Sequence, residues 1–128
     1  MEIRVYYDDT DAGGVVYYSN YLKYFERART EYLRDRGLSI VDMARRGFVF
    51  PAVRVEIDYH ASALLDDLLK VQTSVLEIKK SSFTFTHQVL RSVDGKLLTS
   101  GKVKFACVGP EMKPKRLPEE IIHALKGS

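Results

Sequence analysis

Between residues 19 and 37, apolar side chains repeat with the period of an α-helix. Most charged residues of the segment fall on other faces, as in a helix that packs one side against a core. The apolar members of the repeat are Tyr21, Tyr24, Phe25, Ala28 and Tyr32. Ser19 or Asn20 can begin such a helix, and Gly37 suits the left-handed position that ends it. The pattern predicts a helix of about 17 residues, roughly 25 Å long.

A shorter helix is predicted directly after it. Ser39 and Asp42 have the spacing of a capping box, and Gly47 can stop the helix. Beyond Gly47 the apolar period changes to two, which is typical of a strand with one buried face. The residues on that face are Val49, Val53, Val55, Ile57 and Tyr59. Because Pro51 cannot donate a ladder hydrogen bond, we expect an edge strand or a bulge there.

Three further segments alternate in the same way. The run at 71–75 changes phase at Leu76, which predicts a bulge or burial on both faces. The runs at 83–89 and 97–107 flank the pair Asp94-Gly95, which is typical of a two-residue hairpin turn. The tail from residue 109 onward predicts a loop and then a short helix from Pro118. We expect this tail to carry little of the core.

With a first strand at residues 3–7, these elements amount to five strands and one long helix. They predict an α+β fold in which an antiparallel sheet curls around the helix, as a single domain over residues 1–128. One helix covers only part of such a sheet, and an unpaired strand edge invites association. We therefore expect a homodimer or a dimer of dimers.

Composition narrows the classes of function. The net charge of +3 is spread along the chain, which fits an anionic ligand, and the aromatic residues fall in predicted core positions. Nucleic-acid binding is therefore the least favoured function. No stretch reaches the roughly 18 apolar residues of a membrane span, and the N-terminus has acids where a secretory signal is apolar. We expect a cytoplasmic protein without membrane insertion.

The residue types that bind metals or attack substrates are sparse. Cys107 is the only cysteine, so neither an intramolecular disulfide nor a thiolate cluster can form within one chain, and we expect it in the core. His60 and His87 lack the spacing of metal ligands and are expected to be structural. His123 is expected to be exposed. No serine stands in a G-x-S-x-G setting, so a serine-hydrolase triad has no support.

One continuous motif is much more specific. The run VYYDDTDAGGVVYYSNYLKYFERARTEYLR at 5–34, with VEIDY, LLDDLLKV and SSFTF further on, resembles the hotdog-fold thioesterases of the 4-hydroxybenzoyl-CoA thioesterase family. It is most similar to their YbgC-type acyl-CoA thioesterases, over about residues 3–108. The resemblance implies a hotdog fold, dimers with active sites at the subunit interface, and hydrolysis of an acyl-CoA without metal or other cofactor.

The resemblance also implies roles for four residues. Asp11, the second acid of D-T-D, matches the essential carboxylate of the family, and Tyr7 matches a tyrosine counted as its partner. Position 18 holds Tyr18 where YbgC-type members usually have histidine. The members that act on hydroxybenzoyl thioesters use a backbone N–H there to polarise the carbonyl, and Tyr18 could do the same. Asn20 matches an asparagine that caps the helix or orients the catalytic region.

General chemistry supports such a site. The first turn of a helix offers unpaired N–H groups to a developing negative charge, and Gly13 and Gly14 let the backbone turn and bring a ligand against them. Asp11 can act as general base or as nucleophile, and the sequence leaves both roles open. We also expect the adjoining Val15 and Val16 to contact substrate.

A basic turn is the candidate for the CoA phosphates. Lys79, Lys80, Ser81 and Ser82 join two predicted strands, and the corresponding turn in the family often meets the nucleotide. A solvated hairpin tip is an equally good explanation. Arg54 is a weaker candidate for the same role.

Several alternatives stay open. The acids before the helix could be turn formers and dipole partners only. A binding or scaffold protein on the same fold could hold acyl-CoA or acyl carrier protein without hydrolysing anything. Dehydratases and hydratases of acyl thioesters share the architecture, but they generally need a histidine near the helix, and this region contains none.

Overall fold

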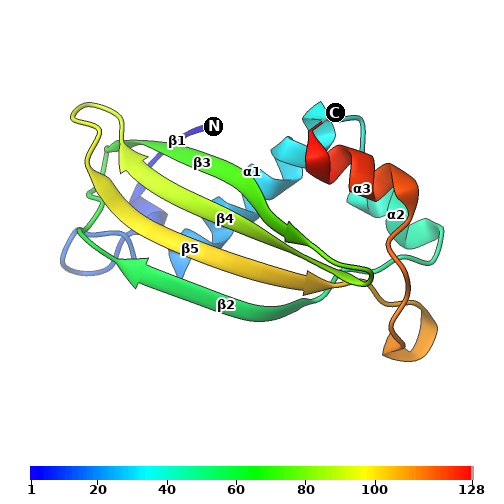
Figure 1. Cartoon of the computed structure of the whole chain (residues 1–128). Helices are drawn as coiled ribbons and strands as arrows, with labels where there is room; N and C mark the ends of the chain where they lie inside the picture. The colour runs from blue at the N-terminus through cyan, green and yellow to red at the C-terminus, as the bar shows by residue number, and fades with distance from the viewer. Residues whose placement is uncertain (128) are drawn as a thin grey trace.

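The computed structural model describes residues 1–127 as a curved sheet with helices on one side (Figure 1). The strands are β1 (Glu2–Arg4), β2 (Ala52–Tyr59), β3 (Leu68–Ile78), β4 (Ser82–Arg91) and β5 (Leu97–Ala106). The helices are α1 (Asn20–Asp35), α2 (Ile40–Arg45) and α3 (Glu119–Lys126), with short 3-10 turns at Tyr7–Asp9 and Pro110–Met112. Every helix among these residues is too short or too polar to pass through a membrane.

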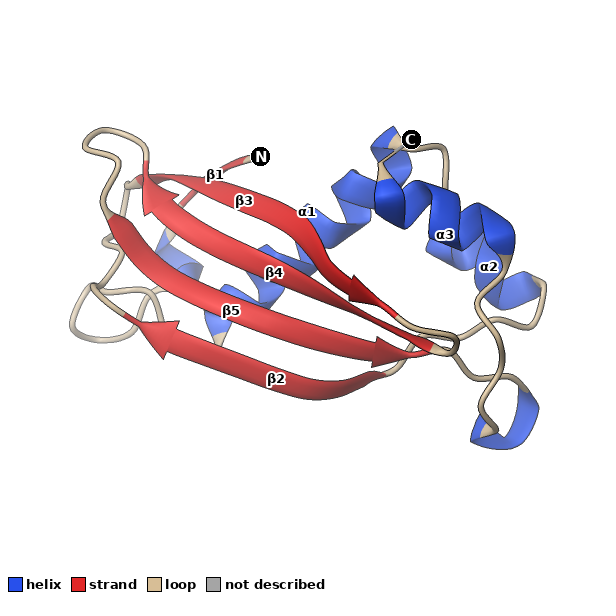
Figure 2. Cartoon of the chain, viewed as in Figure 1, coloured by secondary structure: helices blue, strands red, loops and turns tan. Residues whose placement is uncertain are grey.

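The five strands form one antiparallel sheet in the order β1-β3-β4-β5-β2. Figure 2 shows the strands as a single curved layer with α1 lying across one face. The predicted α+β fold, an antiparallel sheet curled around one long helix, is therefore confirmed. The order also leaves β1 and β2 as the two edges.

Local signals in the sequence set the helix boundaries as predicted. Gly37 and Gly47 follow α1 and α2 with φ of 79° and 88°, the left-handed conformation that stops a helix. The Ser39 hydroxyl accepts a hydrogen bond of 3.2 Å from the backbone N–H of Asp42. These contacts depend on neighbouring residues alone, so the sequence pattern could specify them.

Both predicted irregularities of the sheet are present. The register between β2 and β5 shifts between Ala52 and Arg54, directly after Pro51, and β2 is an edge strand. The register between β3 and β4 shifts between Val75 and Glu77, where the apolar phase changes. At the second shift, Val75 and Ile78 on either side of the bulge both pack against the core.

Two predicted elements differ in length. The first strand ends at Arg4 rather than at residue 7, because Tyr7–Asp9 forms a 3-10 turn. The strands β4 and β5 do form the predicted hairpin, but residues 92–96 connect them instead of a two-residue turn. Asp94 accepts hydrogen bonds from the Lys96 N–H at 3.1 Å and from Arg91 at 3.0 Å, which stabilise the longer connection.

The expectation that the tail carries little of the core is wrong. The side chains of Leu117, Ile121, Ala124 and Leu125 are buried. They join a second apolar cluster that includes Leu33, Met43, Phe83, Phe85 and Cys107. The tail covers the end of the sheet that α1 alone leaves open, and α3 lies beside α2 there (Figure 1). The amphipathic pattern of a helix of only eight residues gave little sign of this role.

A buried histidine fixes the distance between α1 and the sheet. His87 of β4 is 1% exposed and stacks on Phe25 of α1, with ring centroids 4.5 Å apart and planes 9° apart. Its neighbour across the ladder is Gly101, where an added Cβ would lie 2.5 Å from the Phe25 ring. Glycine at this position therefore lets the Phe25 ring reach the sheet.

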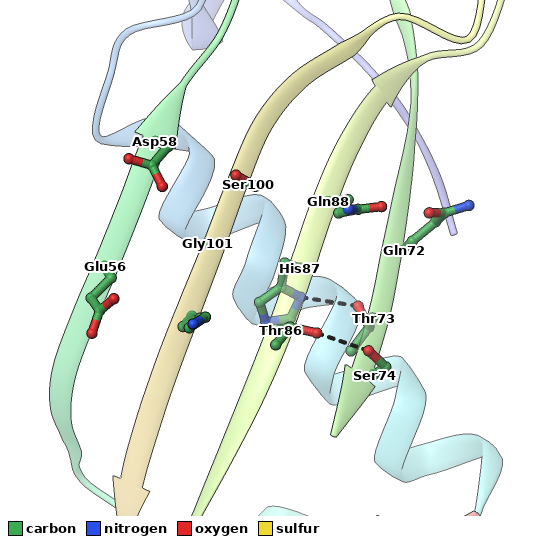
Figure 3. Close-up of a pocket in the computed structure, with 11 residues that line it drawn as sticks. Glu56, Asp58, Gln72, Thr73, Ser74, Thr86, His87, Gln88, Ser100 and Gly101 are labelled. Atoms are coloured by element: carbon green, nitrogen blue, oxygen red, sulfur yellow. Dashed lines mark hydrogen bonds between the residues drawn. The ribbon is translucent and has the colours of Figure 1, made fainter. Parts of the chain in front are cut away.

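Hydrogen bonds at both ring nitrogens define the tautomer of His87. Arg29 can only donate, so Nε2 of His87 accepts its hydrogen bond of 3.2 Å. The Nδ1–H then donates to the Thr73 hydroxyl at 3.1 Å, the bond drawn between these residues in Figure 3. Burial, and secondly the charge of Arg29, lower the pKa of His87 to about 3. The imidazole is therefore neutral at physiological pH.

This histidine predicts a loss of stability in mild acid. Below the ordinary pKa of 6.5 the unfolded chain takes up a proton that the folded chain refuses until about pH 3. Between pH 7 and pH 5 we expect this one group to lower the free energy of unfolding by about 2 kcal/mol. Urea unfolding at both pH values should show that His87→Gln removes most of this difference. The same change at the exposed His123 should leave it intact, and an unchanged difference in the His87 variant would contradict the assignment.

Candidate functional site

A tight glycine-containing loop presents the carboxylate of Asp11. Its Oδ1 accepts a hydrogen bond of 2.8 Å from the N–H of Gly13, and the Asp11 N–H donates to the Val15 carbonyl at 2.9 Å. A Cβ at Gly13 would lie 3.3 Å from that same Oδ1, and Gly14 has a φ of 79°. The side chain of Asp11 is exposed, so its second oxygen is open to a ligand.

The end of the loop is anchored to the core. The Val16 N–H donates to the Ala63 carbonyl at 2.9 Å, and Val15 forms a β-bridge with Leu64. The side chain of Val16 is buried in the main apolar cluster. Val16 therefore anchors the loop to the core. We expected its side chain to contact substrate, but burial prevents such a contact. Val15 is half-buried and keeps some access.

Asn20 connects the loop to α1 through Asp9. Its Nδ2 donates to Oδ1 of Asp9 at 3.0 Å, while Oδ2 of Asp9 accepts from the N–H of Tyr6 at 2.9 Å. Burial and the nearby Asp9 carboxylate raise the pKa of the Tyr24 hydroxyl. Asp9 is thus a structural member of the site. The sequence does not reveal this role of Asp9, because the motif does not distinguish an acid that holds the loop by hydrogen bonds from one that faces solvent.

Among the described residues, the turn that leads into α1 leaves the backbone N–H of Tyr18 free. The N–H groups of Tyr17 and Asn20 donate to Asp9 at 3.0 Å and to Tyr17 at 2.8 Å. The N–H of Tyr18, between them, makes no hydrogen bond within residues 1–127. The carbonyl of Tyr18 accepts a hydrogen bond of 2.8 Å from the hydroxyl of Tyr59, at the end of β2. This contact, which has no counterpart in the sequence pattern, steadies the turn.

Exposed aromatic side chains surround this end of the molecule. Tyr7 is 81% exposed and Tyr18 62%, and Tyr6, Tyr17 and Tyr59 are also exposed. The rings of Tyr17 and Tyr18 lie 4.7 Å apart. In the part of the chain that the structure describes, the Tyr7 hydroxyl makes no hydrogen bond to Asp11. The predicted pairing of Tyr7 with Asp11 thus stays a prediction, and the apolar surface is available for contact with another molecule.

The expected phosphate-binding residues lie far from Asp11 within one chain. The turn at 79–82 joins β3 to β4 at one end of the sheet, whereas the loop before α1 lies at the other end (Figure 1). Lys79 is bonded to Glu77 at 3.2 Å, and Arg54 to Glu56 at 2.8 Å on exposed β2. The sequence could not show this separation, which depends on the length of the strands.

A separate apolar groove of about 310 Å³ opens between α1 and the sheet. Its apolar walls are Leu33, Ile40, Phe50, Phe83, Phe85 and Phe105. Glu26, Arg29 and Thr30 of α1 complete its lining. This volume lies at the low end of the roughly 300–1,000 Å³ of ligand pockets in proteins. The sequence pattern gives no sign of the groove, because its walls come from five separate segments.

A wider depression of about 590 Å³ lies over the strands that Figure 3 shows. Polar side chains such as Glu56, Asp58, Gln72 and Gln88 line it, and α1 lies behind the strands in that view. None of the predicted site residues lines this depression, so we place the candidate site at the Asp11 loop. Among residues 1–127, no three side chains of the types that bind metals are grouped closely enough to hold an ion.

Known proteins resemble this chain over nearly its whole length. The model of the thioesterase-like superfamily matches residues 5–125. The acyl-CoA thioester hydrolase YbgC of Escherichia coli O6:H1 is 39% identical over 125 residues, which cover 97% of this chain and 92% of that protein. The acyl-CoA thioesterase YbgC of Haemophilus influenzae is 43% identical over 129 residues, with 97% and 93% covered.

Solved structures show the same fold. The 1,4-dihydroxy-2-naphthoyl-CoA thioesterase Slr0204 from Synechocystis superposes with a TM-score of 0.94 at 27% identity, and 98% of this chain and 93% of that chain are covered. The DHNA-CoA thioesterase from Staphylococcus aureus gives a TM-score of 0.92 at 28% identity, with 99% and 87% covered. The hotdog fold is thereby confirmed.

The bond between Asn20 and Asp9 predicts a test of how the loop is held. Asn20→Ala removes a buried hydrogen-bond partner of the Asp9 carboxylate, and we expect it to lower the free energy of unfolding by roughly 1.5–3 kcal/mol. Ser19→Ala is the matched control, since within residues 1–127 the Ser19 side chain makes no capping bond. Urea unfolding of both variants measures the difference. Equal, small effects would show that the bond does not brace the loop.

Proposed function

This chain belongs to the thioesterase-like superfamily, and on that premise we propose that it hydrolyses a small or medium acyl-CoA to the free acid and coenzyme A. The observation that carries the proposal is that an exposed carboxylate and a free backbone N–H lie at the same end of the molecule. The exposed carboxylate of Asp11 stands on a loop that leads into α1, and the N–H of Tyr18, in the turn just before α1, is without an acceptor among residues 1–127. Hydrolysis of a thioester needs a base or nucleophile and a hydrogen-bond donor to the carbonyl oxygen.

The chemistry follows from the charges that develop. A water oxygen attacks the acyl carbon while Asp11 takes its proton, or the Asp11 carboxylate attacks first and water then hydrolyses the resulting anhydride. In both cases the carbonyl oxygen becomes negative and the N–H of Tyr18 stabilises it. As the tetrahedral intermediate collapses, the C–S bond breaks and coenzyme A leaves as a thiolate, which gives the free acid in the first route and the anhydride, then hydrolysed by water, in the second. Because a thiolate leaves readily, the reaction needs little help from an acid and no metal or further cofactor.

The remaining residues of the loop support this step. Gly13 gives room for the Asp11 carboxylate, and Gly14 has the positive φ that turns the chain toward α1. Tyr7, which is exposed in one chain, stays a candidate partner of Asp11 once substrate or a second copy covers it. Asn20 acts through Asp9 and positions the loop.

We propose that the complete site requires two copies of the chain. The strand β2 lies at the edge of the sheet and exposes the side chains of Val53, Val55 and Tyr59. An exposed edge strand with apolar side chains favours association with another strand. Its Tyr59 end touches Tyr18 near the Asp11 loop, and its Ala52 end pairs with Phe105 near the 79–82 turn. Antiparallel pairing of β2 with a second β2 therefore carries Asp11 of one copy toward the opposite end of the other sheet. A dimer, or a dimer of such dimers, follows.

The same pairing gives the basic turn a function. Lys79, Lys80, Ser81 and Ser82 of one copy come toward the Asp11 loop of the other. Two ammonium groups and two hydroxyls there suit the phosphates of coenzyme A. Arg54, which is bonded to Glu56 beside the pairing edge, is the weaker candidate.

Asp11→Asn tests the chemistry. Asparagine keeps the oxygen that accepts from Gly13, so the loop should fold, but it lacks the charge needed by a base or nucleophile. On aliphatic and aromatic acyl-CoA thioesters we expect CoA release to fall roughly 100- to 10,000-fold. Asp8→Asn, at an exposed acid three residues earlier, is the control and should keep its rate. Full activity of the Asp11 variant would refute the mechanism, and binding without turnover by the parent protein would favour the non-hydrolytic alternative.

Val55→Lys tests the assembly. Val55 lies on the exposed edge strand, and a lysine there places like charges together when two β2 strands pair. Light scattering coupled to size exclusion should show a monomer, and CoA release should be lost with it. Val93→Lys, in the exposed hairpin connection, should stay dimeric and active. A dimeric, active Val55 variant would place the interface elsewhere.

A further inference from the structure

Arg29 is a charged side chain in an apolar setting. It lies on the α1 face that lines the groove, and its guanidinium stacks over the Phe105 ring at 4.8 Å from the centroid. Burial lowers its pKa to about 10, so the group is still a cation at neutral pH. Within residues 1–127 it forms no ion pair, and Glu26, which lines the same groove, affects it only as a nearby charge. A half-buried cation without a direct ion pair is costly to the protein, and the charge of Glu26 offsets only part of that cost.

The surroundings hold this cation in one orientation. One N–H of the Arg29 guanidinium donates to His87, which is fixed in turn by Thr73 and by stacking on Phe25. His87 is neutral and accepts only this hydrogen bond at Nε2, so it orients the guanidinium without neutralising it. Of the five N–H donors of arginine, the others have no acceptor among the described residues. The structure thus keeps several donors of a fixed cation unused.

The groove around Arg29 is suited to a short chain. Four phenylalanine rings and two aliphatic side chains form its walls, and its volume of about 310 Å³ is small. It lies near the Ala52 end of β2, because Phe50 immediately precedes that strand and Phe105 pairs with Ala52. In the dimer proposed above, this is the end that meets the Asp11 loop of the second copy. An acyl group held at that Asp11 can extend into the groove.

We propose that Arg29 makes the enzyme selective for acyl groups that carry a carboxylate at their far end, that is, for the monothioesters of short dicarboxylic acids. The inference rests on the proposed thioesterase function and names the substrate class of that same site. A carboxylate supplies the direct ion pair that Arg29 lacks within residues 1–127 and two acceptor oxygens that match the guanidinium fork. The methylene chain between carboxylate and thioester packs against the phenylalanine rings.

A pair of isosteric substrates tests the inference. Glutaryl-CoA and 5-methylhexanoyl-CoA have the same chain, ended by a carboxylate in one and by an isopropyl group of the same shape in the other. We expect the parent protein to favour glutaryl-CoA by roughly 10- to 100-fold in kcat/KM, after subtraction of the rate without enzyme. Arg29→Met should abolish or reverse this preference, chiefly through KM for glutaryl-CoA, and should change kcat/KM for 5-methylhexanoyl-CoA much less. Arg29→Lys, which retains the charge, should retain part of the preference for glutaryl-CoA.

The controls separate the possible failures. Arg27→Met makes the same change on the exposed side of α1 and should keep the preference of the parent. A parent protein that hydrolyses both substrates equally well, or an Arg29→Met variant that loses both activities together, would overturn the inference while leaving the thioesterase proposal standing. A parent protein that releases no CoA from these or any other acyl-CoA thioesters would instead refute the proposed function, and the inference with it.

Discussion

The close packing of α1 against the middle of the sheet is the constraint on which the rest of the structure depends. Phe25 reaches the sheet because Gly101 offers no side chain, and it stacks on His87 from the neighbouring strand. This contact fixes the distance between α1 and the sheet and the orientation of α1 about its own axis. It therefore determines which residues of the helix face the core, which face the groove, and where its first turn ends.

The candidate catalytic groups follow from that placement. The first turn of α1 emerges at one end of the sheet, where Asn20 and Asp9 tie the preceding loop to the helix and Tyr59 of β2 holds the carbonyl of Tyr18. The loop residues then have little freedom except at Asp11, whose carboxylate stays exposed. A catalytic group must be both held and accessible, and the hydrogen bonds around Asp11 meet both needs.

The same packing leaves three features of the single chain without a partner within residues 1–127. The edge strand β2 is exposed, the aromatic residues near Asp11 are exposed, and the groove and basic turn lie at the other end of the sheet. The two-fold pairing that we propose at β2 would account for all three, because an antiparallel pair brings opposite ends of the two sheets together. In that proposed dimer, Arg29, which forms no ion pair within residues 1–127, would lie at the junction where an anionic acyl group is bound.

The sequence by itself determined the features that depend on neighbouring residues: α1 and α2 with their glycine stops, the bulges after Pro51 and at Leu76, and the β4–β5 pair. The long motif also predicted Asp11, Tyr18 and Asn20 as residues of the site. Other features depend on residues far apart in the chain, and only the tertiary structure decided them. These are the burial of Val16 and of the C-terminal helix, the bracing role of Asp9, the distance between Asp11 and the 79–82 turn, and the groove around Arg29. The physical reason is that periodicity and turn chemistry act over a few residues, whereas burial, desolvation and the meeting of charges depend on which distant segments pack together.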